Sequence, residues 1–154
     1  MYRRLSNNFG KTKVAIFTAG EEMKKGMFVE KDLVNGEVNL PAAIAGTNVF
    51  IVDVEPDITC ELSVLNNISD YDVLLNDIAE GKLVSLELMQ VGEEYATDQF
   101  IATGIAVGDI LEVNTAGQLV IGTGTTSPLV ATDIAYDDAG HTLLAFTITE
   151  SLFA

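Results

Sequence analysis

The side chains that could do chemistry are few and scattered. His141 is the only histidine and Cys60 the only cysteine among 154 residues, so they cannot form the usual nitrogen and sulfur site for zinc. His141 follows the turn formed by residues 137–140, a position typical of an exposed histidine, and no G-x-S-x-G sequence offers it a nucleophile. Cys60 lies in the apolar run ITCELSVL, as a small buried hydrophobe would. We therefore predict no catalytic residue and no cofactor.

Acidic residues are abundant, but their spacing does not define a site. Two groups stand near predicted turns: Asp53, Glu55 and Asp57, and Asp133, Asp137 and Asp138. Neither group has the D-x-D-x-D-G spacing of an EF-hand, so we predict no metal site, although a calcium site among these turns stays open. Among 23 acidic residues no pair stands out as a glycosidase pair. The Gly/Thr-rich loop 122–127 leads to a strand and not to a helix, which disfavours a phosphate cradle.

The charge is distributed unevenly along the chain. The net charge is −15, yet seven of the eight basic residues fall within the first 31 positions. An acidic body disfavours nucleic acid and anionic membranes as partners. The basic end predicts docking onto an acidic partner or onto the acidic face of another copy, although its lysines could equally serve only as a solvated surface. The candidate partner-binding residues are Arg3, Arg4, Lys11 and Lys13.

The elements that must position these residues are mostly strands. Residues 1–12 lack periodicity and predict an extended N-terminal arm, while residues 13–154 predict a single β-rich domain. Many short apolar runs separated by Gly, Asn, Asp and Thr predict an all-β fold, a small β-barrel or sandwich. No apolar run approaches the ~18 residues of a spanning helix, and the chain does not open on a signal peptide. We therefore expect synthesis in a host cytoplasm.

Three segments between the predicted strands have distinct expectations. Residues 70–80 predict one short helix, which Ser69 would cap and Gly81 would end. Residues 91–99, VGEEYATDQ, predict an acidic loop, and residues 100–107, FIATGIAV, predict a short strand. The strand expected over 82–91 has no purely apolar side, which predicts that one of its faces meets a partner.

One pattern of strands and turns occurs twice. Residues 26–40, GMFVEKDLVNGEVNL, are echoed by residues 108–122, GDILEVNTAGQLVIG. Each copy predicts a strand, a tight turn and a second strand, followed by a loop and a further apolar strand. The dipeptide Asn35-Gly36 favours a type I′ hairpin turn in the first copy. Two such units could close one small barrel around a pseudo-twofold axis, because each alone leaves an open edge. Convergence of two ordinary hairpins remains the alternative.

The second copy carries a family resemblance. Ala106 to Leu119 follow the pattern A-x-G-D-x-L-x-V-x-x-x-G-x-L, and a Gly/Thr-rich loop and the run Pro128-Leu129-Val130-Ala131 come next. This stretch resembles the small β-rich decoration, or cement, proteins of tailed bacteriophage capsids. It covers roughly residues 99–149, and the first half joins only through its echo. A biotinyl-type domain would carry a lysine at the hairpin tip, where residues 115–117 read Thr-Ala-Gly.

The resemblance implies a non-enzymatic virion protein that binds the outer capsid surface and stabilises the head lattice. Its implied partners are the major capsid protein and further copies of itself, with a trimer as one possible state, and its implied place is the capsid surface. Two alternatives stay open. One is another virion component, such as a head fibre base, neck or tail protein, and the other is a small-molecule-binding or hydrolytic β-barrel.

Overall fold

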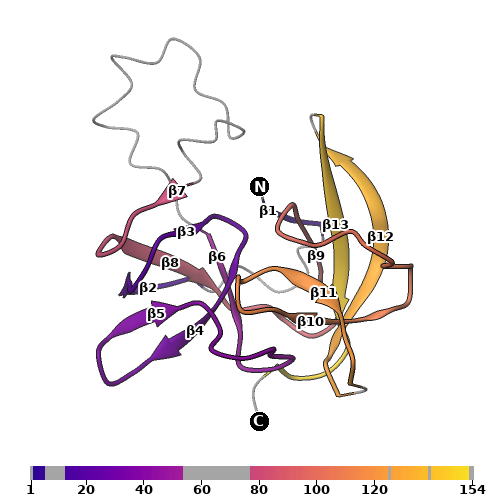
Figure 1. Ribbon diagram of the computed structural model, residues 1–154. Coiled ribbons are helices and arrows are strands. Elements are labelled where there is room, and N and C mark those ends of the chain that lie inside the picture. The colour runs from indigo at the N-terminus through magenta and orange to yellow at the C-terminus, as the bar shows by residue number, and fades with distance from the viewer. Residues whose placement is uncertain (1, 6–12, 54–76, 125, 139, 153–154) are drawn as a thin grey trace.

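The computed structural model describes residues 2–5, 13–53, 77–124, 126–138 and 140–152. Every regular element in these ranges is a β-strand, which confirms the predicted all-β class. None of the described segments is an apolar helix long enough to cross a membrane. The strands form a closed barrel, a six-stranded sheet and a small two-stranded sheet (Figure 1).

The closed barrel lies in the first half of the chain, and we call it barrel 1. Its strands follow the order β2-β5-β4-β6-β8 around the ring. They are β2 (Lys13–Ala19), β4 (Phe28–Asp32), β5 (Glu37–Asn39), β6 (Phe50–Val52) and β8 (Leu83–Glu87). The strand pair β2 and β5 is parallel, and the other pairs are antiparallel. The two-stranded sheet, β3 (Met23–Lys24) with β7 (Asp77–Ile78), lies beside it.

The six-stranded sheet comes mainly from the second half of the chain, and we call its last five strands barrel 2. The order is β1-β9-β13-β12-β10-β11. The strands are β1 (Tyr2–Arg4), β9 (Glu94–Thr97), β10 (Ile110–Val113), β11 (Leu119–Ile121), β12 (Leu129–Asp138) and β13 (His141–Ile148). A single parallel bridge between Phe100, just after β9, and Leu119 in β11 links the two ends of the β9-to-β11 order. This bridge closes the ring.

The two barrels have the same topology. Going around each ring, β2, β5, β4, β6 and β8 correspond to β9, β11, β10, β12 and β13. The registers agree as well: Val29 faces Phe50 as Leu111 faces Leu129, and Val52 faces Leu86 as Ala131 faces Phe146. Even the parallel contact recurs, because Ala19 pairs with Val38 as Phe100 pairs with Leu119. The sequence echo is therefore a structural repeat.

Four backbone hydrogen bonds recur at corresponding positions. Gly26 N donates to Val52 O, and Gly108 N donates to Ala131 O, each at 2.8 Å. The partner bonds run from Val52 N to Met27 O and from Ala131 N to Asp109 O. Both glycines have φ near +90° (91° and 92°), a conformation that side-chain-bearing residues rarely adopt. In the third pair, Met27 N donates to Lys24 O, and Asp109 N donates to Ala106 O. In the fourth pair, Gly20 N donates to Val38 O, and Ile101 N donates to Leu119 O.

The interiors of the two barrels are filled from the same positions. Corresponding buried pairs are Met23 and Ile105, Val29 and Leu111, Val38 and Leu119, Val52 and Ala131, and Leu86 and Phe146. Alternation along each strand places these side chains inside and their neighbours outside. Burial of this many aliphatic groups is the main driving force for both barrels.

The barrels share a core where they meet. Phe28 and Ile51 point out of barrel 1 and join the hydrophobic cluster of barrel 2, where the Phe28 ring lies 5.8 Å from that of Phe146. Met89, just after β8, belongs to the same cluster, so this end of the strand predicted over 82–91 packs against the second half of the chain. The partner predicted for one face of that strand stays a prediction.

The second hairpin completes this junction. We call residues 32–36 tip 1 and residues 114–117 tip 2, the turns of the β4–β5 and β10–β11 hairpins. Tip 2 contacts barrel 1, with Phe28 N donating to Gly117 O at 2.9 Å. Both hairpins point toward the left in Figure 1, tip 2 onto barrel 1 and tip 1 away from the molecule.

Several predictions need correction. The two hairpin units do not close one barrel together, because each belongs to a different ring. The predicted type I′ turn at Asn35-Gly36 is wrong: Gly36 has φ +71°, but Asn48 is the one described non-glycine residue with positive φ. Instead, Asp32 accepts hydrogen bonds from the backbone N of Val34 and of Asn35.

The segments between strands also differ from expectation. The end of the predicted helix, Asp77–Ile78, is strand β7, and residues 70–76 lie outside the described residues. The segment predicted as an acidic loop contains strand β9. Its acidic side chains are accommodated because Glu93 accepts a hydrogen bond from Tyr95 and Glu94 accepts one from Thr132. The strand predicted over 100–107 is a loop apart from the bridge at Phe100.

The first residues are part of the sheet and not an appendage. Strand β1 pairs antiparallel with β9, with Tyr2 opposite Thr97 and Arg4 opposite Tyr95. Tyr2 is buried in the core of barrel 2. The predicted extended arm is thus an edge strand over Tyr2–Arg4, and residues 6–12 lie outside the described residues.

Candidate functional site

The strongest concentration of buried charge surrounds Arg4. Its guanidinium Nη1 lies 3.2 Å from Glu87 Oε1, and its Nη2 forms an ion pair with Glu93. The Arg4 side chain is 5% exposed, and both glutamate side chains are fully buried. Strand β1 brings the arginine, and β8 and the turn before β9 bring the two carboxylates. The cluster therefore joins the N-terminal strand to the connection between the barrels.

Two tyrosines flank this cluster. The Tyr95 hydroxyl donates to Glu93 Oε2 at 3.3 Å and accepts a hydrogen bond from Gln90 N at 2.8 Å. Burial raises the pKa of Tyr95 to about 12, with the charge of Glu93 adding to the effect. Burial and then the nearby charge of Glu87 raise the pKa of Tyr2 far above its usual value. Both hydroxyls are therefore neutral at any physiological pH.

Arg4 stays charged in this setting. Burial by itself lowers the pKa of Arg4, but the hydrogen bond to Glu93 and the charges of Glu93 and Glu87 raise it above the ordinary arginine value. A guanidinium with two buried carboxylates is costly to disrupt, because removing either side leaves an uncompensated charge in a medium of low dielectric constant. The arrangement fits a structural clamp, because both carboxylates are fully buried and form ion pairs with the same guanidinium.

A third buried carboxylate, Asp53, directly follows β6. Asp53 is 4% exposed, its Oδ1 lies 3.5 Å from Lys25 Nζ, and its backbone N donates to Ser85 O. Lys25 precedes Gly26, whose carbonyl accepts a hydrogen bond from Thr97 Oγ1 at 3.0 Å. These contacts tie the start of the first repeat unit to β9 of barrel 2.

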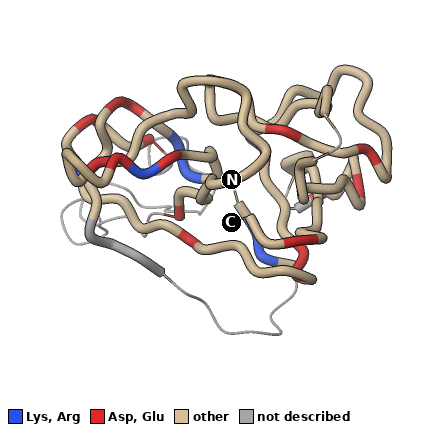
Figure 2. The backbone as a smooth tube through the Cα atoms, turned by 90° about the horizontal axis from the view of Figure 1, so that it is seen from below, with Lys and Arg blue, Asp and Glu red and all other residues tan. Residues whose placement is uncertain are grey.

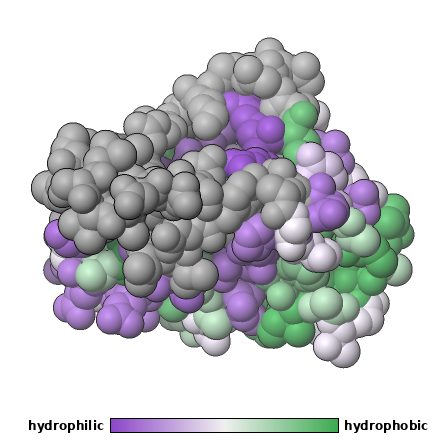
Figure 3. All heavy atoms as spheres, turned by 90° about the horizontal axis from the view of Figure 1, so that it is seen from above, coloured by the Kyte–Doolittle hydropathy of each residue, from purple (hydrophilic) through white to green (hydrophobic). Residues whose placement is uncertain are grey.

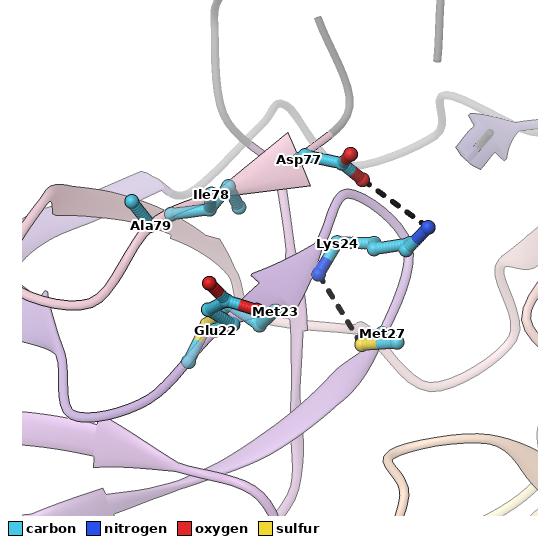
Figure 4. A pocket seen from close by; sticks show the side chains of 7 residues that line it. All are labelled: Glu22, Met23, Lys24, Met27, Asp77, Ile78 and Ala79. Carbon is cyan, nitrogen blue, oxygen red and sulfur yellow. Dashed lines mark hydrogen bonds and ion pairs between the residues drawn. The ribbon is translucent and has the colours of Figure 1, made fainter. Parts of the chain in front are cut away.

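One cavity lies beside the strand pair β3 and β7. It measures about 430 Å³ and is lined by Glu22, Met23, Lys24, Met27, Asp77, Ile78 and Ala79 (Figure 4). Lys24 Nζ and Asp77 Oδ1 form an ion pair of 3.2 Å across the strands, and Lys24 N donates to Met27 Sδ. One lysine and two acids of this kind, with the lysine already paired, do not define a ligand chemistry.

The predicted partner-binding residues are not brought together as a set. Arg4 is committed to the internal clamp, and Arg3 is half-buried on the neighbouring position of β1. Lys13 begins β2 and faces Glu87 in the strand pairing, and Lys11 lies outside the described residues. The sequence signal for Arg4 was its charge, and no sequence pattern distinguished it from Arg3 or indicated Glu87 and Glu93 as its partners.

The other candidate residues also take their places. His141 begins β13 opposite Asp138 and is partly exposed. Within the described ranges no three His, Cys, Asp or Glu side chains are arranged to hold a metal ion. Cys60, Glu55 and Asp57 lie outside those ranges.

No known protein family matches the sequence, and no curated protein matches it.

Proposed function

We propose that the protein is a virion structural protein that binds the outer surface of a tailed-phage capsid and stabilises the head lattice. The major capsid protein is its proposed partner, and the capsid surface is its proposed location. In this role the protein would act by binding the capsid through its surfaces, without catalysing a reaction.

The observation that carries the proposal is the motif Ala106 to Leu119, which resembles capsid decoration proteins. Each of its characteristic residues has a structural task. Gly108 adopts φ +92°, Asp109 accepts a hydrogen bond from Ala106 N at 2.8 Å, and Gly117 at φ +68° forms tip 2. The three apolar positions, Leu111, Val113 and Leu119, are fully buried. The motif therefore specifies a scaffold, which suits a protein whose task is to occupy a place in a lattice.

The surface charge supports the same proposal. Acidic residues are distributed over both barrels, and the basic described residues are few (Figure 2). An acidic exterior keeps particles apart by mutual repulsion and discourages binding to nucleic acid. Because many weak contacts act together on a lattice, no conspicuous single site is required.

Sedimentation and labelling of virus particles test the proposal. Particles purified from cells that produce this protein should contain it in many copies, and antibodies against it should label heads in electron micrographs. Labelling confined to necks, tails or fibres would replace the proposal with another virion component. Absence from the particles would overturn both.

The contribution of the basic end needs point substitutions, because deleting residues 1–12 would also remove β1 and the Arg4 clamp. We expect Arg3→Gln combined with Lys13→Gln to weaken binding to purified heads, while Lys82→Gln, an exposed basic position on barrel 1, should leave it unchanged. Equal binding by all three proteins would remove the basic end from the proposed interface.

A further inference from the structure

The contact between the two barrels supplies a template for a contact between molecules. Tip 2 seats on barrel 1 so closely that a Cβ atom added at Gly117 would lie 2.8 Å from Phe28 O and 2.9 Å from Leu40 Cδ2. The third neighbour is Met27 Cβ at 3.3 Å. Under these contacts Phe28 and Ile51 are fully buried.

The repeat places a second set of the same two surfaces elsewhere on the molecule. Tip 1 corresponds to tip 2, with Gly36 in the place of Gly117. Met27, Phe28 and Leu40 correspond to Asp109, Ile110 and Ile121. The equivalent of Ile51 is Val130. We call the surface of Ile110, Ile121 and Val130 the free face, because in the described part of the chain no third barrel covers it.

Tip 1 presents apolar side chains to solvent. Leu33 is 78% exposed and Val34 is 92% exposed, whereas tip 2 has the smaller and more polar Thr115 and Ala116. The turn is held rigidly by Asp32, whose carboxylate accepts from two backbone N–H groups and from Asn35 Nδ2. An ordered hairpin with an exposed Leu-Val pair at its end is the form that a docking element takes.

The free face is hollowed at one side, and the hollow has a mixed lining. A cavity of about 340 Å³ is lined by the apolar residues Ile110, Pro128 and Val130 and by the polar residues Thr126, Ser127, Thr149 and Glu150. Ile110 and Val130 are partly exposed there, in contrast with their fully buried equivalents in barrel 1. Ile121 of the free face is exposed, as are Ile101 and Val107 in the segment between β9 and β10. With Leu33 and Val34 they make five of the nine exposed large hydrophobic side chains of the described residues.

The two surfaces lie on different halves of the molecule. Tip 1 is at the far left in Figure 1, and the strands β10, β11 and β12, which carry the free face, lie in the right-hand half. Figure 3 shows hydrophobic residues gathered on the right-hand side of the molecule as seen from above. A contact between different surfaces of identical molecules is heterologous, and it produces a ring or an open chain of copies.

We propose that tip 1 of one molecule docks onto the free face of a second copy, repeating between molecules the contact that joins barrel 1 to barrel 2. The occupant of the free face is therefore this same chain, with Leu33 and Val34 covering Ile110 and Ile121. The proposal goes beyond capsid binding and does not depend on it, because self-association and head binding are measured separately.

Charge predicts how this association responds to salt. The chain has a net charge of −15, so two copies repel one another at low ionic strength. The carboxylates of Asp32 and Asp109, which flank the two surfaces, are both held by backbone N–H groups of their own turns. Association through an apolar contact should therefore become stronger as salt is added, opposite to the behaviour of a contact built on ion pairs.

Sedimentation velocity of the full chain between about 1 μM and 1 mM tests the proposal. The natural protein should associate with rising concentration, more strongly in high salt. Leu33→Asp combined with Val34→Asp should abolish docking by tip 1, and Ile121→Asp should abolish docking onto the free face. Each change should weaken association at least about a hundredfold. Val91→Asp, an exposed aliphatic position in neither surface, is the matched control. Circular dichroism should show the same fold and melting temperature in all four proteins.

Mixing the two defective variants gives the decisive result. Each retains the surface that the other lacks, so an equimolar mixture should form one-to-one dimers and nothing larger. A mixture that stays monomeric would overturn the proposal, as would a natural protein that is monomeric throughout this range. Association of the tip 1 variant equal to that of the natural protein would overturn it as well.

Discussion

Barrel 1 and barrel 2 are built alike inside and differ outside. The positions that they share are glycines at the same φ, backbone hydrogen bonds and buried aliphatic residues. The positions that differ are on the surface: Leu33-Val34 at one tip against Thr115-Ala116 at the other, and Lys25 against Val107 beside the equivalent glycines. The comparison teaches that the repeated sequence encodes a scaffold, and that what each copy contacts is decided by the residues around it.

The two barrels also differ in what stabilises them. Barrel 2 receives an additional strand, β1, and an aromatic series in which Tyr2 stacks near Tyr95 at 6.2 Å and Tyr95 near Phe146 at 5.9 Å. Barrel 1 instead has Lys31 over the Phe50 ring at 3.9 Å, and burial lowers the pKa of that lysine. The clamp around Arg4 joins β1, which pairs with β9 of barrel 2, to Glu87 in β8 of barrel 1, and its contribution can be tested by substitution.

The largest effect is expected from Arg4→Ala. The substitution leaves Glu87 and Glu93 buried without their cation, so the free energy of unfolding should fall by about 4 kcal/mol. Arg3→Ala, on the neighbouring half-buried position of β1, should cost about 1 kcal/mol or less. Urea unfolding of the two variants measures both values, and equal losses would show that the clamp contributes no more than an ordinary side chain.

The next largest effect is a difference in the free energy of unfolding between alanine substitutions at two equivalent outward-facing positions, Phe28 in barrel 1 and Ile110 in barrel 2. Phe28→Ala creates a cavity in the shared core and should cost about 3 kcal/mol, while Ile110→Ala on the free face should cost about 1 kcal/mol. The measurement is again the free energy of unfolding, taken at low protein concentration so that self-association does not contribute. A larger loss at Ile110 would mean that the barrels do not meet at Phe28.

The two tip glycines sharpen the comparison further. Gly36→Ala introduces a side chain at φ +71° into open space and should cost about 1 kcal/mol. Gly117→Ala has the same backbone cost and also meets Phe28 O at 2.8 Å, so its total should be about 2 kcal/mol or more. Thermal unfolding of the two variants compares them. If Gly36→Ala were the more damaging change, tip 2 would not be the seated one.

The smallest effect is an alkaline one specific to barrel 2, which has Tyr95 where barrel 1 has Val14. The folded pKa of Tyr95, about 12, is above the unfolded value near 10, so its contribution to stability is complete below pH ~10 and is lost as the pH rises toward 12. Absorbance at 295 nm during rapid titration should show a tyrosine ionising near pH 12 that is missing in Tyr95→Phe. A Tyr95 that ionises near pH 10 would contradict its burial beside Glu93.

The sequence predicted the parts of the fold that local chemistry controls. The hairpins at residues 26–40 and 108–122 follow from glycines placed at turns and from alternation in the strands. It did not predict the separate closure of each ring, because closure depends on contacts such as Phe100 with Leu119 that no local pattern encodes. Strand β9 was missed because Glu93 and Glu94 look solvent-exposed until Arg4 and Thr132 are known as their partners.

The site was predicted less well, for a related reason. Arg4 was expected to bind an external partner on the basis of its charge, but a charge in a sequence does not show whether its counterion is internal. The sequence did not indicate that Leu33 and Val34 are exposed, because they continue the apolar pattern of the preceding strand. In the structure the strand pairing ends at Asp32, so both residues belong to the turn. Only the position of the equivalent tip 2 indicates what such a tip can contact.

Scalar couplings across hydrogen bonds, measured by NMR on isotopically labelled protein, test the central claim that the two halves of the chain form barrels of the same topology. We predict couplings from Gly26 N to the Val52 carbonyl and from Gly108 N to the Ala131 carbonyl, of similar size because both bonds are 2.8 Å. A second pair should join Gly20 to Val38 and Ile101 to Leu119, each at 2.9 Å. Couplings in one half of the chain without their counterparts in the other would contradict the repeat, and with it the contact proposed between copies.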